Sequence, residues 1–193
     1  MKTHLLSGLL VALCLCIFVF SWLLSKQSVF GNQSFDVEYQ EQLISASMVY
    51  QNGVGIVVVE AMDYECPPCR AQQQQVNSIL EAHPSIQWRV IPLQNQLHPL
   101  SLEALKLAHI AGRQGRFPEY HRVAMARSVF TKREVQELRK LVGRDQETGS
   151  SYASRLSQIS KLKIGATPTY FVFTGNSGIV LYSAKSVQEF LSK

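Results

Sequence analysis

The chain has 193 residues, a length typical of one domain with room for an insertion. Hydrophobic residues make up 46% of it and charged residues 17%, which excludes a disordered or collagen-like protein and predicts a buried core. The formal net charge is +5, but the Lys and Arg residues form no cluster interleaved with aromatic residues, so nucleic-acid binding is not expected.

The first predicted element is an apolar helix over residues 5–24. This stretch carries no charged side chain, and a helix rising about 1.5 Å per residue over that length would cross the ~30 Å hydrocarbon layer of a bilayer. Bulky Trp22-Leu23-Leu24 follow the one passable signal-peptidase site, so residues 1–24 are expected to remain as a membrane anchor, with a cleaved signal peptide as the alternative. Lys2 before the span favours a cytoplasmic N-terminus, and therefore an exported location for the rest of the chain.

Residues 25–40 are predicted to be a linker, because they are polar and rich in Ser and Gln without a clear period. The fold is expected to begin near residue 41. Its first strand is expected over Val54–Met62, a continuous run of mostly apolar residues typical of a central strand.

A helix and a second strand follow this first strand. Apolar residues after the Cys-Pro-Pro-Cys sequence recur with helical spacing up to Pro84, and Ile86–Pro92 has the composition of a strand. The order strand, helix, strand predicts a βαβ unit whose two strands are parallel.

Residues 99–162 are predicted to be helical. Apolar residues with helical spacing begin after Pro99, and a capping box at Thr131 and Glu134 marks the start of a later helix. After this insertion, residues 163–193 are expected to form a hairpin and a last helix, capped by Ser186 and Glu189.

The four cysteines fall into two pairs with different expected roles. Cys14 and Cys16 lie inside the apolar span and are interpreted as small hydrophobic residues. Cys66 and Cys69 lie where a strand ends and a helix begins, where unpaired amides and the helix dipole favour a thiolate and bring the pKa of a thiol into the range ~3.5–7.5. Cys66 is therefore the expected nucleophile, and Cys69 the thiol that closes or opens a disulfide with it.

The same pair could also form a structural disulfide or bind a metal ion. A structural disulfide would close a very small loop and restrain little of the unfolded chain. Zinc needs four ligands, and no second Cys pair or suitably spaced His pair is present, so no metal site is expected. Copper(I) carriage by the two thiolates is an open alternative. Reversible thiol–disulfide chemistry is favoured over these roles.

Three segments, in order along the chain, resemble signatures of the DsbA-type branch of the thioredoxin superfamily: VVVEAMDYECPPC at 57–69, the helical sequence from Leu102 to His121, and GATPTYFV at 165–172. The resemblance covers residues 41–193. It implies an α/β, thioredoxin-like fold, with a central mixed β-sheet flanked by helices, formed by residues 41–98 and 163–193. Residues 99–162 would then be an inserted helical domain.

The resemblance also implies roles for individual residues. Cys66 would be the exposed nucleophile and Cys69 the resolving thiol, with Glu60 a buried acid that exchanges protons with Cys69. Pro168 would be a cis-proline opposite the cysteines. The residues expected to meet the substrate are Thr167, Pro67 and Pro68.

The implied activity is dithiol–disulfide exchange on exported proteins at the periplasmic face of a bacterial inner membrane, without a cofactor, and with a membrane redox partner that resets the cysteine pair. An oxidase is preferred, with a reductase, an isomerase, and a non-enzymatic copper(I)-binding or assembly module as alternatives. The oxidase pattern has a histidine between the cysteines, whereas Pro67 and Pro68 offer neither a polar side chain nor a backbone donor.

Nearby charges and histidines complete the expectations for the site. Arg70 is expected to favour the Cys66 thiolate in part, and Asp63 and Glu65 to oppose it. Packing or surface positions, rather than catalytic ones, are expected for the four histidines of the folded region: His83, His98, His109 and His121.

Overall fold

The computed structural model describes residues 36–143 and 150–193. The apolar stretch at 5–24 and residues 25–35 of the predicted linker lie outside these ranges. Among the helices within them, none is both long and apolar enough to cross a membrane.

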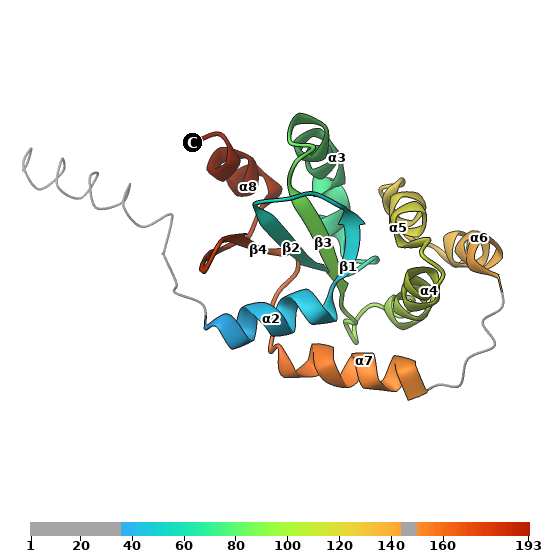
Figure 1. Ribbon diagram of the computed structural model, residues 1–193. Coiled ribbons are helices and arrows are strands. Elements are labelled where there is room, and N and C mark those ends of the chain that lie inside the picture. The colour runs from blue at the N-terminus through green and yellow to red at the C-terminus, as the bar shows by residue number, and fades with distance from the viewer. Residues whose placement is uncertain (1–35, 144–149) are drawn as a thin grey trace, which may run out of the picture. The chain divides into compact units, whose positions relative to one another are not determined.

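A mixed five-stranded sheet forms the centre of the folded region, in the order β1-β3-β2-β4-β5 (Figure 1). Strands β2 and β3 are parallel, as the predicted βαβ unit requires, whereas β4 runs antiparallel to both β2 and β5. Edge strand β1 pairs antiparallel with β3 and was not predicted. The strands are β1 Met48–Gln51, β2 Val57–Met62, β3 Gln87–Pro92, β4 Thr169–Thr174 and β5 Ser177–Leu181.

Helices cover both faces of this sheet, which confirms the predicted α/β class. Figure 1 shows α2 and α7 side by side on one face and α3 with α8 on the other, while α4, α5 and α6 gather to one side. The helices are α2 Val37–Ala46, α3 Pro67–Ala82, α4 Ser101–Arg113, α5 Phe117–Met125, α6 Lys132–Val142, α7 Ser150–Lys161 and α8 Ala184–Leu191.

Helix α2 begins inside the segment that was predicted to be linker. Asp36 caps it by accepting a hydrogen bond from the backbone of Glu38 at 3.2 Å. Leu43 and Ala46 are fully buried in a core cluster with Phe171 of β4. The sequence pattern concealed this helix because only these two of its residues are buried and the rest of its surface is largely polar.

The helices between β3 and β4 pack in two different parts of the fold. Helices α4, α5 and α6 pack on one another, whereas α7 packs on α2. Ile159 of α7 and the adjoining Leu162 belong to the same core cluster as Leu43. The segment predicted as one inserted domain therefore contributes its last helix to the cover of the sheet.

Two helix starts test the predicted caps. The capping box of Thr131 and Glu134 is present at the start of α6. The predicted cap of the last helix is wrong, because α8 begins after Ser183, whose Oγ accepts a hydrogen bond from the backbone of Ser186 at 3.1 Å. Ser183 has the extended backbone that an N-cap requires, whereas Ser186 already lies inside the helix.

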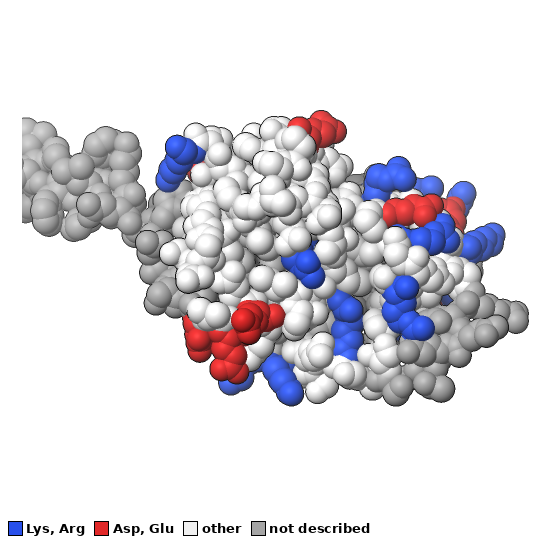
Figure 2. All heavy atoms as spheres, in the orientation of Figure 1, with Lys and Arg blue, Asp and Glu red and all other residues white. Residues whose placement is uncertain are grey.

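On the face seen in Figure 2, acidic side chains gather at the lower left, both signs lie at the right, and separate basic side chains lie between them on a largely uncharged surface. Both signs mix over α5 and α6, where Glu134 pairs with Arg127 at 2.5 Å and Glu137 pairs with Arg133 at 3.2 Å. On this face, therefore, acidic side chains of the helical insertion lie among its basic side chains and form ion pairs with them.

Replacing Leu43 by Ala tests whether α2 belongs to the folded core. Because Leu43 is fully buried, the substitution is expected to lower the free energy of unfolding by about 2–5 kcal/mol. Urea unfolding followed by circular dichroism measures the change, with Glu41→Ala on the exposed face as the control. Equal stability of the two variants would show that α2 is not part of the core.

Candidate active site

Cys66 and Cys69 lie at the start of α3, directly after the end of β2. Cys66 is the N-cap residue and its backbone amide donates to the carbonyl of Asp63 at 3.1 Å. Both thiols are free, and only 4% of Cys66 and 1% of Cys69 is exposed. The nucleophile is thus more enclosed than the resemblance implied, while Pro67 and Pro68 between the cysteines are exposed.

The proline loop lies against Cys66, although it is far away in the sequence. The Thr167–Pro168 peptide bond is cis, as expected. The Thr167 hydroxyl donates to Cys66 Sγ at 3.4 Å, and the Cys66 thiol donates to the Thr167 carbonyl at 3.6 Å. In the dithiol form this carbonyl, which was expected to bind substrate, is therefore occupied by the thiol.

The amides of the helix do not cap Cys66 in the expected way. Its side chain makes no capping hydrogen bond, and the first two helical positions are Pro67 and Pro68, which have no N–H. The donor at the sulfur is therefore a side-chain hydroxyl from another part of the chain. Sequence spacing alone did not indicate this donor.

Cys69 differs electrostatically from Cys66. Burial is the largest cause that raises the pKa of the Cys69 thiol, and its hydrogen bond with Cys66 adds to the effect. Cys69 thus remains protonated at neutral pH in the dithiol form, and Cys66, the more accessible of the two, is the sulfur positioned to attack.

Glu60 lies inside the fold beneath the cysteines. It is fully buried in β2, and its Oε2 accepts a hydrogen bond from Trp88 Nε1 at 3.0 Å, whereas Oε1 has no hydrogen-bond partner among the described residues. Burial raises its pKa to about 7, against a smaller lowering by the Trp88 hydrogen bond. Its charge contributes to the raised pKa of Cys69, which places the two groups within electrostatic reach.

The acids expected to oppose a Cys66 thiolate are engaged elsewhere. Asp63 is fully buried, and its carboxylate accepts hydrogen bonds from His98 and Ser101, each at 2.9 Å. Glu65 accepts a hydrogen bond from the backbone of Leu100 at 2.7 Å. Both side chains therefore tie the active-site loop to the segment that leads into α4.

Arg70 makes its hydrogen bonds with other parts of the chain, not with Cys66. Its guanidinium is buried, stacks over the Phe130 ring, and donates to carbonyl groups of Tyr64, Ala124, Arg127 and Val129. The expectation that Arg70 favours the thiolate is not supported by this geometry. Instead, Arg70 fastens the start of α3 to the end of α5.

Two histidines make contacts near the site. His121 is fully buried, its Nδ1 lies 3.2 Å from the Tyr64 hydroxyl, and burial lowers its pKa to about 3, so it packs as a neutral ring. His98 pairs with Asp63, a contact that the sequence analysis missed. The available signal was topological, because residues after two parallel neighbouring strands meet at one edge of a sheet.

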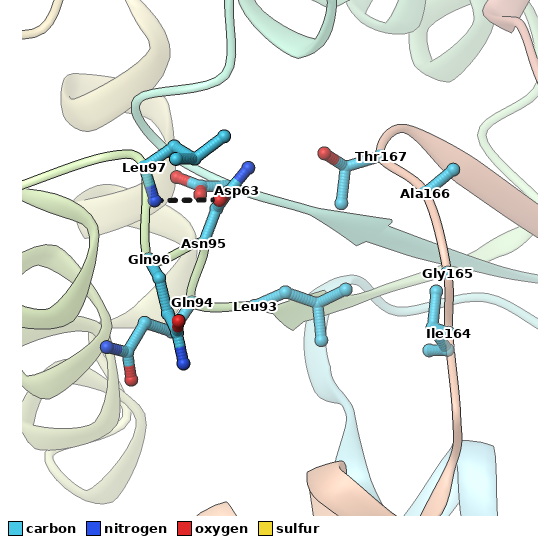
Figure 3. Close-up of a pocket in the computed structure, with 10 residues that line it drawn as sticks. All are labelled: Asp63, Leu93, Gln94, Asn95, Gln96, Leu97, Ile164, Gly165, Ala166 and Thr167. Carbon is cyan, nitrogen blue, oxygen red and sulfur yellow. Dashed lines mark hydrogen bonds between the residues drawn. The ribbon is translucent and has the colours of Figure 1, made fainter.

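A groove opens beside Cys66, with a cavity volume of about 420 Å³. One wall is the loop after β3, residues 93–97, and the other is the proline loop, residues 164–167 (Figure 3). Asp63 is the one ionisable side chain that lines it. Cys66 is connected to this groove through Thr167, which lines it and contacts Cys66 Sγ.

The described parts of the chain contain no group of three or more His, Cys, Asp or Glu side chains arranged to hold a metal ion. The two thiols remain the candidate ligands for the copper(I) alternative.

Solved structures similar to this chain share a thioredoxin-like fold. A thioredoxin-like oxidoreductase from Silicibacter pomeroyi DSS-3 is 22% identical, with a TM-score of 0.61 over 79% of this chain and 95% of that one. The catalytic domain of Proteus mirabilis ScsC is 18% identical, with a TM-score of 0.61 over 81% and 96%. The thiol-disulfide exchange protein α-DsbA2 from Wolbachia pipientis is 17% identical, with a TM-score of 0.59 over 80% and 91%. The fold is therefore thioredoxin-like.

Curated proteins match a smaller part of the chain. A Na(+)/H(+) antiporter, NhaA 3 of Salinispora tropica, is 36% identical over 73 residues, and NhaA 1 of Salinispora arenicola is 37% identical over 73 residues. Each match covers 37% of this chain. The chain therefore spans only 11% of the length of either antiporter. No protein-family model matches the chain.

The substitution Glu60→Gln tests the buried acid. Since the pKa of Glu60 is about 7 in the fold against an ordinary 4.5, the folded state holds this proton more tightly than the unfolded state. Stability should fall by roughly 3 kcal/mol between about pH 4.5 and pH 7 because of this group, and Glu60→Gln should remove that fall.

Chemical unfolding of the dithiol form across this pH range measures the effect as a difference between wild type and variant. The substitution Glu41→Gln, at an exposed position, controls for the loss of one charge. A constant difference between wild type and Glu60→Gln across the range would show that Glu60 is ionised in the fold.

Proposed function

We propose that this protein is a DsbA-type thiol–disulfide oxidoreductase that forms disulfides in exported proteins. The observation that carries the proposal is the position of Cys66 Sγ, which contacts both the carbonyl and the hydroxyl of Thr167 beside cis-Pro168. This contact joins a nucleophilic thiol, a loop with backbone groups for a bound chain, and an open groove. The likeness to the solved thioredoxin-like structures supports the fold on which the proposal is based.

The chemistry proceeds by two exchanges at Cys66. A client thiolate attacks Sγ of Cys66 in the oxidised protein, so that the Cys66–Cys69 bond breaks, a mixed disulfide forms, and Cys69 leaves as a thiolate. Glu60 supplies the proton that Cys69 then takes up, since burial favours the thiol form there. The client's second thiolate attacks the mixed disulfide, leaving the client oxidised by two electrons and Cys66 reduced.

The direction of the reaction follows from which form the protein stabilises. Stabilising the dithiol form makes the disulfide a stronger oxidant. The Thr167 hydroxyl donates to Cys66 Sγ, and the carboxylates of Asp63 and Glu65 are bound by donors of their own. These contacts favour the oxidase over the reductase and the isomerase.

The proposal extends to the location of the protein. Residues 5–24 anchor it at the periplasmic face of the inner membrane, residues 25–40 join the anchor to the folded region, and a membrane redox partner reoxidises the cysteine pair. The apolar character of residues 5–24 is the observation that supports this location. Clients carry free thiols and bind in the groove beside Thr167 and the exposed prolines of the Cys-Pro-Pro-Cys sequence.

Equilibration with glutathione buffers tests the function. The full chain is expected to exchange two electrons at Cys66 and Cys69, with an equilibrium constant on the oxidising side of thioredoxin's, whose potential is about −270 mV. Quenched samples separated by mass give the fractions of dithiol and disulfide, and Cys66→Ser is the inactive control. A potential at or below that of thioredoxin would favour a reductase.

Trapping of clients separates the enzyme from the non-enzymatic alternatives. Cys69→Ala is expected to accumulate mixed disulfides with a disulfide-containing peptide through Cys66: the Cys66 thiolate attacks the peptide disulfide and releases one peptide thiol, and the resolving thiol is missing. Copper(I) that stays bound to the wild type against a strong chelator, together with no trapping, would favour the copper-binding module. Absence of both would favour an assembly module.

Thr167→Val tests the contact between the two loops. Loss of the hydroxyl that donates to Cys66 Sγ should shift the equilibrium with glutathione about threefold to tenfold towards the disulfide form. Thr167→Ser retains the hydroxyl and is expected to behave like the wild type. An equal shift in both variants would show that packing of the Thr167 methyl group, and not its hydroxyl, sets the equilibrium.

A further inference from the structure

The client's thiols also have to lose and gain protons, and the groove contains few groups able to exchange them. Glu60 is fully buried under Cys69, so it is not accessible from the groove. The residues between the cysteines are Pro67 and Pro68, which have no titratable side chain. Asp63 is the one ionisable residue in the lining of the groove. A proton acceptor for the client must therefore act through Asp63 or beside it.

The Asp63 carboxylate has three hydrogen-bond partners. Its Oδ1 accepts from the Glu65 amide at 2.8 Å, and its Oδ2 accepts from His98 Nδ1 and from Ser101 Oγ, both at 2.9 Å. Both carboxylate oxygens are therefore engaged by groups of the fold before a client binds. Of its partners, the imidazole is the group that exchanges protons near neutral pH.

His98 directly follows the residues 93–97 that form one wall of the groove. Its sequence neighbour Leu97 and its hydrogen-bond partner Asp63 both line the cavity, and Figure 3 shows these two on one side with Thr167 opposite. The side chain of His98 is 22% exposed, against 1% for Asp63. The ring is thus anchored at one edge to a buried carboxylate and partly open to solvent.

The pairing selects one form of the imidazole. Because the Asp63 carboxylate can only accept, the proton of the neutral ring is on Nδ1, which leaves the Nε2 lone pair available. Two acidic side chains of the loop after β2 lie near this ring. Asp63 contacts it directly, and the Glu65 carboxylate accepts a hydrogen bond from the backbone of Leu100, two residues after His98. The start of α4 adds the neutral Ser101 hydroxyl.

We propose that His98, oriented by Asp63, accepts the proton of the client thiol that attacks the mixed disulfide between the client and Cys66, and returns it in the reverse direction. The inference rests on the disulfide-exchange function proposed above. In the second exchange, Nε2 takes the proton from the client's second thiol, and the resulting thiolate attacks the client's first sulfur. The client disulfide forms, the bond to Cys66 breaks, and Cys66 leaves as a thiolate. The buried Glu60 exchanges a proton with Cys69, and His98 exchanges a proton with the client thiol.

One thiol exchange isolates this step. The full chain carrying Cys69→Ala, with Cys66 in a mixed disulfide with glutathione, is mixed with a peptide that has one cysteine. Release of glutathione from the protein, as a mixed disulfide with the peptide, is followed from pH 5 to pH 9. This range spans the ordinary pKa of an imidazole, about 6.5. His98→Asn is the informative variant, because the Asn amide can donate to Asp63 as Nδ1 does but has no basic nitrogen.

If the proposal holds, His98→Asn slows release about a hundredfold at pH 7 and removes one ionisation from the pH profile. Ser101→Ala, which removes a different donor to the same carboxylate, changes the rate without removing that ionisation. The potential of the Cys66–Cys69 pair, measured with both cysteines present, is expected to stay the same in His98→Asn. A wild-type pH profile in His98→Asn would overturn the proposal.

A spectroscopic measurement on the wild type is independent of whether any variant folds. In protein containing ¹⁵N-labelled histidine, neutral His98 is expected to be protonated at Nδ1, the nitrogen that lies on the Asp63 carboxylate. A neutral ring protonated at Nε2 would overturn the proposal. Failure of the wild type to exchange with glutathione at all would instead refute the oxidoreductase function itself, so the two failures are distinguishable.

Discussion

The site depends on the pairing of β2 with a strand on each side. Because β3 runs parallel to β2, Pro92 at the end of β3 lies opposite Met62 at the end of β2. Because β4 runs antiparallel, Thr169 at its start lies opposite Ala61. The loops that follow β2 and β3 and the loop that precedes β4 therefore meet at one edge of the sheet. The cysteines, His98 and Thr167 come from these three loops, and none of them would lie near the others in a different strand order.

This arrangement gives the disulfide two unlike sides. Beneath Cys69 the environment is buried, and burial keeps protons on both Cys69 and Glu60. Beside Cys66 the groove is open, and its polar character comes mainly from amide side chains and backbone, with one buried carboxylate. In the proposed reaction an attacking client therefore meets the outer sulfur, and the inner sulfur leaves into a region that favours its neutral form. The asymmetry gives the two thiols separate roles.

The active-site loop is also held by contacts that look unfavourable in the sequence alone. Asp63 and Glu65 are acids close to a reactive thiol, yet both fasten the loop to the segment before α4. Arg70 is a cation beside Cys69, yet it binds carbonyl groups at the end of α5. These three side chains join the active-site loop and the start of α3 to the helical insertion, so that the insertion forms part of the scaffold of the site.

The sequence alone predicted the residues that carry chemistry and determined most of the elements that hold them. The run at Val54–Met62, the Cys-Pro-Pro-Cys sequence at a helix start and the Thr-Pro before a strand are local features, and local features follow from backbone preference and hydrophobic period. Helix α2 and edge strand β1 were not predicted from the sequence, because their segments have little apolar periodicity of their own. Both are held in place by packing or pairing with partners far along the chain. The tertiary structure alone decided the partners of each charged or reactive group: Thr167 at the Cys66 sulfur, His98 at Asp63, and Arg70 turned towards α5. The physical reason is that a hydrogen bond depends on where two atoms lie in space, and for these groups that is set by strand order and burial, which sequence spacing does not encode.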